Sequence, residues 1–357
     1  MPGSSIRKNS AKLSGLSRND LIPMTGGRRK GDRLVLALLF LVLLASLLLA
    51  LGVGGGRFRW TDVGSVFRYP ALTGFERIIL FEIRLPRIVL AGLVGSGLAL
   101  CGGILQGLFQ NPLVDPYVLG ISSGAAFGAV LAILTGTVAG LLTIPLFAFS
   151  FALLTAVLVF SLGRVGRKFP LSTMLLSGMA VGFFFSALIT LGMFVSGEEL
   201  HQVVFWLMGG FWNRSWRDVG MVLPLFLVSV PVLLIHAREL NALLLGERVA
   251  ASIGVETERV KKRLLVVSSL LVAACVSVSG VIGFIGLVIP HLVRLLVGQD
   301  HRRLLPATSL VGGIVLLWAD TLSRTIVHPS ELPVGIVTSL LGVPFFMYLL
   351  RRGRGKW

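Results

Sequence analysis

Side chains that could perform catalysis or hold a metal are sparse in this chain and widely separated. The Gly-x-x-x-x-Gly-Lys-Ser/Thr pattern of a phosphate-binding loop is absent from the sequence, so we expect no ATP hydrolysis by such a loop. The five histidines lack metal-ligand spacing; they are His201, His236, His291, His301 and His328. Cys101 and Cys275 both lie in apolar runs, as small buried hydrophobic residues do. We therefore expect no enzyme activity, metal site, disulfide or bound cofactor.

The composition indicates a membrane protein. Hydrophobic residues make up 55% of the 357 residues, mean hydropathy is +0.89 and only 14% are charged. Soluble domains carry about a quarter charged residues, and a soluble chain of this length could not bury so much apolar surface. We therefore expect an all-α polytopic membrane protein. The net charge is +17, and the basic residues that produce it lie between the apolar runs. Membrane topology therefore explains this charge better than nucleic-acid binding does.

Hydropathy predicts ten membrane-spanning helices between residues 34 and 350. Their ranges are 34–54, 88–109, 117–136, 140–162, 171–195, 219–236, 264–281, 283–297, 305–326 and 333–350. The eighth is short, rich in glycine and contains Pro290, so protein must cover it inside the membrane. We expect residues 1–33 to form a disordered, basic cytoplasmic arm and residues 351–357 a basic cytoplasmic tail.

The distribution of basic residues predicts that both termini are cytoplasmic. With that orientation, 24 Lys and Arg lie inside and nine outside, as the positive-inside rule requires. Arg84 and Arg87 before the second span, and Arg324 at the end of the ninth, lie outside against this rule. They indicate either an anionic partner outside or pairing within the chain, for which the candidate carboxylates are Glu76, Glu82 and Glu331.

Two local features bear on how the spans pack. Small residues spaced four apart let the second span approach its neighbours closely; they are Gly95, Ala99, Gly103 and Gly107. The hinge Gln110–Pro116 contains two prolines, an Asn and an Asp, which prevent a continuous helix. The stretches ILQGLFQNPL and GFIGLVIPHL are similar, one in each half of five spans. They suggest an inverted five-helix repeat, with chance similarity of glycine-rich runs as the alternative.

The longest inside loop, residues 238–263, predicts two short helices. They cover Glu239–Leu245 and Arg248–Ile253, with a break at Gly254. An apolar patch on this loop would comprise Leu243, Leu244, Val249 and Ile253. The loop is therefore a candidate docking surface for a protein partner, and a solvated amphipathic connector is the alternative.

Several motifs, in one order along residues 34–350, resemble the FecCD-type permeases. They are Arg84-Leu85-Pro86-Arg87, Gln106, Asn111-Pro112-Leu113 with Asp115-Pro116, Gly120–Ala125, Gly280–Arg294, Asp300-His301-Arg302 and Glu331–Gly335. Those permeases are the membrane subunits of type II ABC importers for iron–siderophores, haem and vitamin B12. The resemblance implies a homodimer in a bacterial or archaeal plasma membrane. It also implies two ATPase subunits, which bind ATP and Mg, and an extracytoplasmic solute-binding protein.

The resemblance also assigns roles to individual positions. Docking of the solute-binding protein falls to Arg84, Arg87 and Arg324. The cytoplasmic gate would be formed by Asn111, Leu113, Ser172 and Thr173. The fifth and tenth spans would line the pore, with small residues at Gly178, Gly182, Ser186, Thr338 and Ser339. ATPase coupling would involve Leu245, Gly246, Glu247, Ala250 and Gly254.

Two other functions compete with that of an importer permease. An ion-coupled secondary transporter also has inverted repeats, but it requires an acidic residue within a span. Asp320 is the acid that lies well inside a predicted span. The second alternative is a membrane scaffold without transport. Among substrates we expect an iron–siderophore first, although haem and cobalamin importers share the same motifs.

Overall fold

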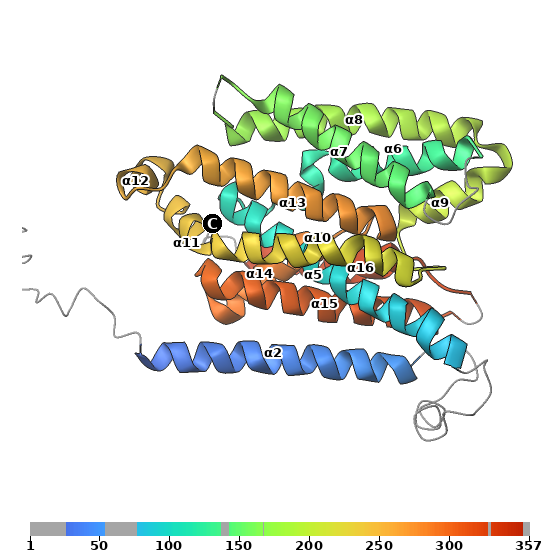
Figure 1. The fold of residues 1–357 in the computed structure, drawn as a ribbon, viewed down its shortest axis with the longest axis horizontal. Coiled ribbons are helices and arrows are strands. Elements are labelled where there is room, and N and C mark those ends of the chain that lie inside the picture. Colours follow the sequence, from blue (N-terminus) through green and yellow to red (C-terminus); the bar gives the residue numbers. More distant parts are fainter. Residues whose placement is uncertain (1–25, 54–76, 137–142, 167, 328–329, 353–357) are drawn as a thin grey trace, which may run out of the picture.

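The all-α fold expected from the sequence is seen in the computed structural model, which describes residues 26–53, 77–136, 143–166, 168–327 and 330–352. Ten helices correspond to the predicted spans (Figure 1). They are α2 (Gly26–Gly52), α5 (Leu85–Leu108), α6 (Ile121–Leu134), α7 (Thr143–Gly163), α8 (Leu171–Val195), α10 (Trp216–Ile235), α13 (Thr257–Ser279), α14 (Ile285–Val297), α15 (His301–Thr325) and α16 (Val334–Arg352).

Seven of the described helices are long and apolar enough to cross a membrane, while α6, α14 and α16 are shorter apolar helices. Short helices connect the spans. They are η1 (Ile79–Arg84), η2 (Pro116–Leu119), η3 (Gly197–Glu199), α9 (Leu200–Met208), α11 (Ala237–Leu243) and α12 (Glu247–Ser252). Helix α2 begins at Gly26, so the prediction of disorder was wrong for residues 26–33. Residues 1–25 and 353–357 lie outside the described ranges.

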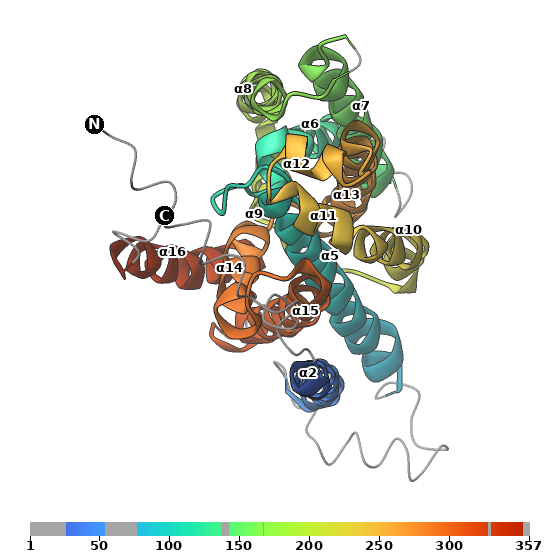
Figure 2. The same ribbon diagram turned by 90° about the vertical axis from the view of Figure 1, so that its left-hand side faces the viewer.

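The bundle has two ends, which we name after the short helices that lie there. The α12 end carries α11 and α12, and the opposite end, which carries α9, is the α9 end (Figure 1). Viewed from the α12 end, α5 runs through the middle of the bundle, with α2 at its edge and α16 and α13 on opposite sides (Figure 2). Helix α2 is held to α15 in part by a hydrogen bond from Trp318 Nε1 to Ser46 Oγ, 3.1 Å long.

The predicted close packing around the second span is confirmed in α5. Nearly every residue from Pro86 to Leu108 is buried, because α10, α13, α14 and α15 surround the helix. Close contact depends on glycine: a Cβ added at Gly95 would overlap the carbonyl of Gly312 on α15, and one added at Gly102 would overlap that of Gly286 on α14. Small residues thus bring these backbones together, as in other membrane bundles.

Helices α6 and α14 each span only part of a bilayer. They contain 14 and 13 residues, whereas a full span needs about 20. Each starts at a residue with left-handed backbone, Gly120 with φ 72° and Phe284 with φ 69°. The two irregular segments that precede them meet at Tyr117, whose hydroxyl donates to Ile282 O at 2.6 Å and accepts from Ile282 N at 3.0 Å. Each short helix is the third of five spans in its half, which agrees with the predicted repeat.

The contact between α5 and α14 yields a stability prediction. Gly102→Ala should lower the melting temperature of the purified chain in detergent, because overpacking of this kind costs about 1–3 kcal/mol. Gly220→Ala on α10 is the matched control, since nothing lies within 4 Å of its added Cβ. Alanine favours a helix over glycine, so the control should melt at the same temperature or higher. Equal melting temperatures for the two variants would contradict the proposed packing.

Candidate functional site

The connector between α10 and α13 folds into two short helices at the α12 end. Helix α11 spans Ala237–Leu243 and α12 spans Glu247–Ser252, each within two residues of its predicted range. Gly246 and Gly254 turn the chain with φ angles of 99° and 90°, which other residues rarely adopt. The two helices predicted for this loop, and the break at Gly254, are therefore confirmed.

An apolar patch faces outward from this connector. Leu245 is 66% exposed, Val249 45% and Ile253 63%. Leu244 lies beside them and is also exposed. Leu243 was predicted to belong to this patch but is buried, because it is on the inner face of α11. Ala250, which the resemblance assigned to coupling, is likewise buried within the chain. We call Leu244, Leu245, Val249 and Ile253 the connector patch.

A buried lysine fixes α12 to the start of α13. Lys261 is nearly fully buried and pairs with Glu247 at 2.5 Å and with Glu258 at 2.9 Å. Glu247, which the resemblance assigned to coupling, therefore directs its carboxylate toward its own chain. Two carboxylates compensate the buried charge of Lys261, as a buried cation requires. The position of α12 thus depends on this ion cluster.

Helix α11 is tied to the start of α15 through Asn241. Its Nδ2 donates to Asp300 Oδ1 at 2.7 Å, and its Oδ1 accepts from the backbone N–H of His301 at 2.9 Å. Asp300 also caps α15 by accepting from the backbone N–H of Arg302 at 3.0 Å. Burial opposes ionisation of Asp300, but the hydrogen bonds from Asn241 and Arg302 outweigh it and lower the Asp300 pKa. Asp300 therefore stays charged at neutral pH.

A second link joins α11 to the hinge that follows α5. Gln110 Nε2 donates to the carbonyl of Leu243 at 2.5 Å. Gln110 has a φ of 49°, which is uncommon for a residue other than glycine. Its side chain connects the connector to the predicted gate residue Asn111, which follows it directly. Nothing in the sequence around Gln110 marks its amide as a contact to the connector, because the two segments are distant in sequence.

The predicted gate residues lie at two places in the chain. Asn111 is exposed, and its Oδ1 accepts from the backbone N–H of Leu113 at 2.9 Å, which shapes the hinge. The Leu113 side chain is 49% exposed. Ser172 and Thr173 lie in the first turn of α8, exposed and half-buried respectively. All four side chains remain available to a partner, and their role as a gate stays a prediction.

The predicted pore residues differ in exposure. Ser186 is exposed, Gly182 and Ser339 are half-buried, and Gly178 and Thr338 are buried. A Cβ at Gly178 would lie 2.9 Å from Leu119 Cα, so Gly178 allows η2 to pack on α8. Thr338 donates to the carbonyl of Gly335, one turn earlier in α16, at 3.1 Å. Both residues thus have packing contacts within the chain, and the role of all five positions in lining a pore stays a prediction.

A buried ion cluster lies near the α9 end of the bundle. Arg87 of α5 donates to Asp320 of α15 through Nη2 at 2.8 Å and through Nε at 3.1 Å. Its Nη1 donates to Glu331 Oε2 at 2.8 Å. Arg324 Nε lies 3.3 Å from Asp320 Oδ2. Arg84 Nη1 donates to the carbonyl of Leu51 at 2.8 Å.

The cluster explains why arginines lie here against the topology rule. Arg84, Arg87 and Arg324 are each less than a tenth exposed. Pairing within the chain, the alternative to an anionic partner, is what the structure shows for Arg87 and Arg324. Of the predicted partners, Glu331 participates, whereas Glu76 lies outside the described residues. Asp320 is a partner that the sequence did not predict. Because both Asp320 oxygens are paired, this acid is not a free ion-coupling carboxylate of the kind a secondary transporter needs.

Comparison with known proteins identifies the family. The profile of the FecCD transport family matches residues 41–352. The chain belongs to the FecCD transport family. The resemblance noted in the sequence is thereby confirmed over nearly the whole membrane domain.

Relatives and a solved structure extend this family assignment. The chain is 44% identical to a cobalamin import system permease protein of Halobacterium salinarum, covering 85% of this chain and 82% of that protein. It is also 44% identical to a hemin transport system permease protein of Yersinia pestis, covering 77% of this chain and 84% of that protein. A solved chain assigned to the metal-chelate type of ABC transporters, in an inward-facing conformation, matches with a TM-score of 0.79 and 37% identity, covering 89% of this chain and 99% of that one.

The buried cluster predicts unequal effects of its two acids on stability. Asp320→Asn should lower the free energy of unfolding by about 3–5 kcal/mol, because it leaves two buried arginines without their shared carboxylate. Glu331→Gln should cost about 1 kcal/mol or less, since the Glu331 side chain is 36% exposed. Thermal unfolding of the purified variants in one detergent measures both. A loss for Glu331→Gln as large as that for Asp320→Asn would contradict this ranking.

Proposed function

We propose that the chain is the membrane-spanning permease subunit of an ATP-driven ABC importer that moves a metal chelate into the cytoplasm. The observation that carries this proposal is the connector patch, an exposed apolar surface on two short helices. Exposed apolar groups on such a polar-rimmed loop suit a protein partner. Family membership supports a role in transport.

The energy source in this proposal is a separate polypeptide. The sequence contains no phosphate-binding loop, so ATP and Mg would bind to two partner ATPase subunits. These subunits would dock on the connector patch. The links from Asn241 to Asp300 and from Gln110 to Leu243 would transmit their movement to α15 and to the hinge. Transport would then depend on the rigidity of these links.

The orientation follows from the same assignment. The α12 end would face the cytoplasm, together with both termini, and the α9 end would face outward. The excess of Lys and Arg predicted for the inside supports this orientation. The chain would lie in a bacterial or archaeal plasma membrane as a multi-pass protein. No nucleic-acid partner is part of the proposal.

A homodimer would complete the transport pathway. Helices α8 and α16 expose many apolar side chains, which lipid or a second copy of the chain would cover. They include Leu176, Phe183, Phe184, Leu340 and Leu341. A two-fold axis beside these helices would place Leu113, Thr173 and Ser186 near their copies. The gate and pore residues would then face a path shared by two subunits.

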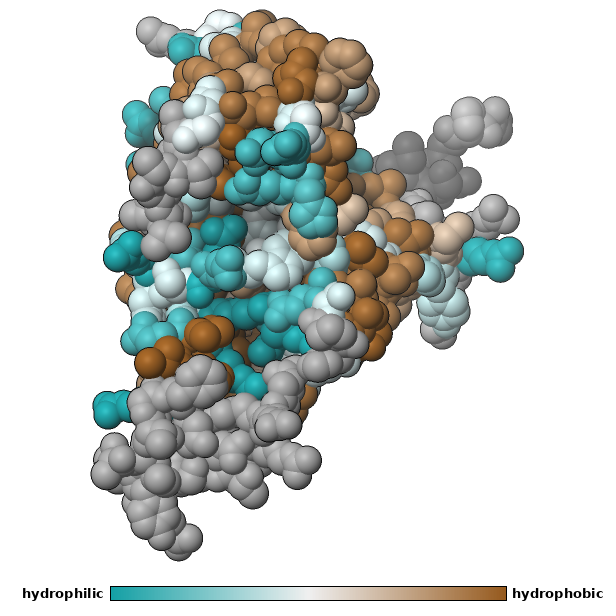
Figure 3. Space-filling model, turned by 90° about the vertical axis from the view of Figure 1, so that its right-hand side faces the viewer, coloured by the Kyte–Doolittle hydropathy of each residue, from teal (hydrophilic) through white to brown (hydrophobic). Residues whose placement is uncertain are grey.

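An extracytoplasmic solute-binding protein would dock on the α9 end. Polar residues gather across the middle of that surface, with apolar residues above them and to their right (Figure 3). Arg84, Arg87 and Arg324 lie beneath the surface. In this proposal they take part in docking after a local rearrangement, or by holding Glu331 in place. Complementary charge would set the orientation of the partner.

The connector patch provides a test of ATPase docking. Val249→Asp should reduce the ATP hydrolysis that the permease supports at least about tenfold, because burying a valine in an interface contributes about 1.5–3 kcal/mol. Ala251→Asp on the same helix is the matched control: Ala251 is exposed on the other side of α12. Hydrolysis is measured with the reconstituted permease–ATPase complex. Equal activity of the two variants would contradict docking at this patch.

Substrate uptake tests the proposed function as a whole. A deletion strain of the host, complemented with the wild-type chain, should take up one of three labelled substrates: a ferric siderophore, haemin or cobalamin. Vanadate, which blocks ABC ATPases, should stop the uptake. Growth of the complemented strain and insertion of the protein into its membrane provide the controls. Uptake of none of the three compounds, or uptake that follows the proton gradient and ignores ATP, would overturn the proposal.

A further inference from the structure

A pocket of about 200 Å³ lies between α7 and α13 near the α12 end of the bundle. It is lined by Phe160, Ser161, Arg164, Phe169, Lys262, Leu265 and Val266. The transport pathway proposed above does not include it, because Figure 2 places α13 and α16 on opposite sides of the bundle. A water molecule occupies about 30 Å³ in the liquid. The pocket therefore has room for a phosphate group and the first atoms of its esters.

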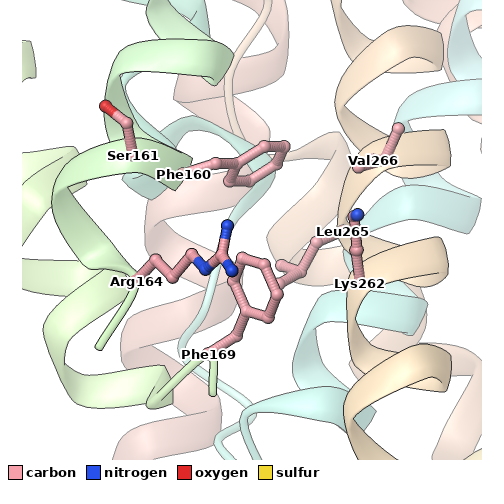
Figure 4. A pocket seen from close by; sticks show the side chains of 7 residues that line it. All are labelled: Phe160, Ser161, Arg164, Phe169, Lys262, Leu265 and Val266. Atoms are coloured by element: carbon pink, nitrogen blue, oxygen red, sulfur yellow. The ribbon is translucent and has the colours of Figure 1, made fainter. Parts of the chain in front are cut away.

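Two cations approach the pocket from facing segments. The Arg164 guanidinium extends from the end of α7 between the rings of Phe160 and Phe169, and Lys262 lies across from it on α13 (Figure 4). Arg164 Nε donates to the carbonyl of Gly166 at 2.6 Å, which fixes the side chain in this direction. Among the described lining residues there is no carboxylate. The pocket therefore has a net positive charge and suits an anion.

The carboxylate nearest in sequence to Lys262 is already engaged. Glu258, one turn earlier on α13, accepts from the backbone N–H of Phe169 at 2.7 Å and pairs with Lys261 at 2.9 Å. Its first contact positions the loop that carries the aromatic wall. Its second belongs to the ion cluster that holds α12. Glu258 thus builds the pocket, while the described residues that line it supply no carboxylate to neutralise Arg164 and Lys262.

The apolar side of the pocket continues along α7 into the membrane region. Val157 and Leu154 lie one and two turns before Ser161, on the same face of α7 by helical spacing. They are 64% and 47% exposed. Val266, across the pocket on α13, is 42% exposed. An apolar strip therefore leads from the two cations toward the membrane centre.

The position along α7 matches the level of lipid head groups. Helix α7 ends at Gly163, so Arg164 follows the last helical residue directly. The 21 residues of α7 cover about 30 Å, the thickness of a bilayer's hydrocarbon core. Cations at such a level commonly meet lipid phosphates, and basic pockets between membrane helices accept anionic head groups.

We propose that this pocket binds the phosphate of an anionic phospholipid, with one acyl chain along Val157 and Leu154. Arg164 and Lys262 would both donate to the phosphate oxygens, as charge-assisted hydrogen bonds favour. A choline or ethanolamine head group would bring its own cation close to these two side chains and be disfavoured. Phosphatidylglycerol carries no such cation. The assignment of this lipid to the cytoplasmic leaflet rests on the orientation proposed above. The binding of the lipid does not depend on that orientation.

Lipid titration of the purified full-length chain tests this site. Delipidated protein is titrated in neutral detergent with dioleoyl phosphatidylglycerol, dioleoyl phosphatidylcholine, glycerol 3-phosphate and inorganic phosphate, and native mass spectrometry counts the bound molecules. Phosphatidylglycerol should bind more tightly than the other three. Arg164→Gln and Lys262→Gln should each weaken it about fivefold, and the double variant about 25-fold, since each cation near a lipid surface contributes about 1 kcal/mol.

Two control variants separate a binding role from a structural one. Lys262→Arg keeps the charge and should bind phosphatidylglycerol within about twofold of wild type. Arg302→Gln removes an exposed cation at the same end of the bundle but outside the pocket, and should change nothing. Three results would each overturn the proposal: equal binding of phosphatidylcholine, undiminished binding by the double variant, or equally tight binding of glycerol 3-phosphate or inorganic phosphate. Uptake assays are not involved, so failure here leaves the proposed transport function intact.

Discussion

Close approach of the α5 backbone to α14 and α15 is the constraint on which the rest of the bundle depends. Within lipid, burial of apolar side chains provides little driving force for helix association, so packing contacts must provide that driving force. Gly95 and Gly312, and Gly102 and Gly286, remove the side chains that would keep the helices apart. The same contacts bring Arg87 to Asp320 near one end and Gly107 to His301 near the other. Both polar clusters therefore rest on glycine packing between them.

The short helices α6 and α14 show how this bundle accommodates irregular backbone. Each follows a segment without regular α-helix, and such a segment is tolerated at membrane depth only where protein covers it. The Tyr117 hydroxyl satisfies both the N–H and the carbonyl of Ile282. Pro116 packs against Gly286. The irregular segment before α6 thus packs against the one before α14. Neither segment would remain covered by protein without the other.

The sequence predicted the elements well and the direction of their side chains less well. Ten spans and the two connector helices follow from hydropathy, proline and glycine, since these depend on local chain properties. Whether Leu243 or Leu245 faces outward depends on how α11 is rotated against α15, which tertiary contacts decide. For the arginines near the α9 end, the sequence predicted an anionic partner outside, with an internal carboxylate as the alternative. Asp320 is distant from Arg87 in sequence, so no local pattern could pair them.

The two links from α11 give the connector a mechanical role beyond presenting a surface. A patch attached only through the flexible ends of its loop could move without effect on the spans. Asn241 instead bonds to the residues that begin α15, and Gln110 bonds α11 to the hinge after α5. Helices α5 and α15 are themselves in extensive contact. A displacement of α11 must therefore either break these hydrogen bonds or move the start of α15 and the hinge with it. The partly buried bond to Asp300 is charge-assisted, so breaking it costs more than breaking a neutral one. The connector is thus coupled to both α15 and the hinge for as long as the bonds from Asn241 and Gln110 hold.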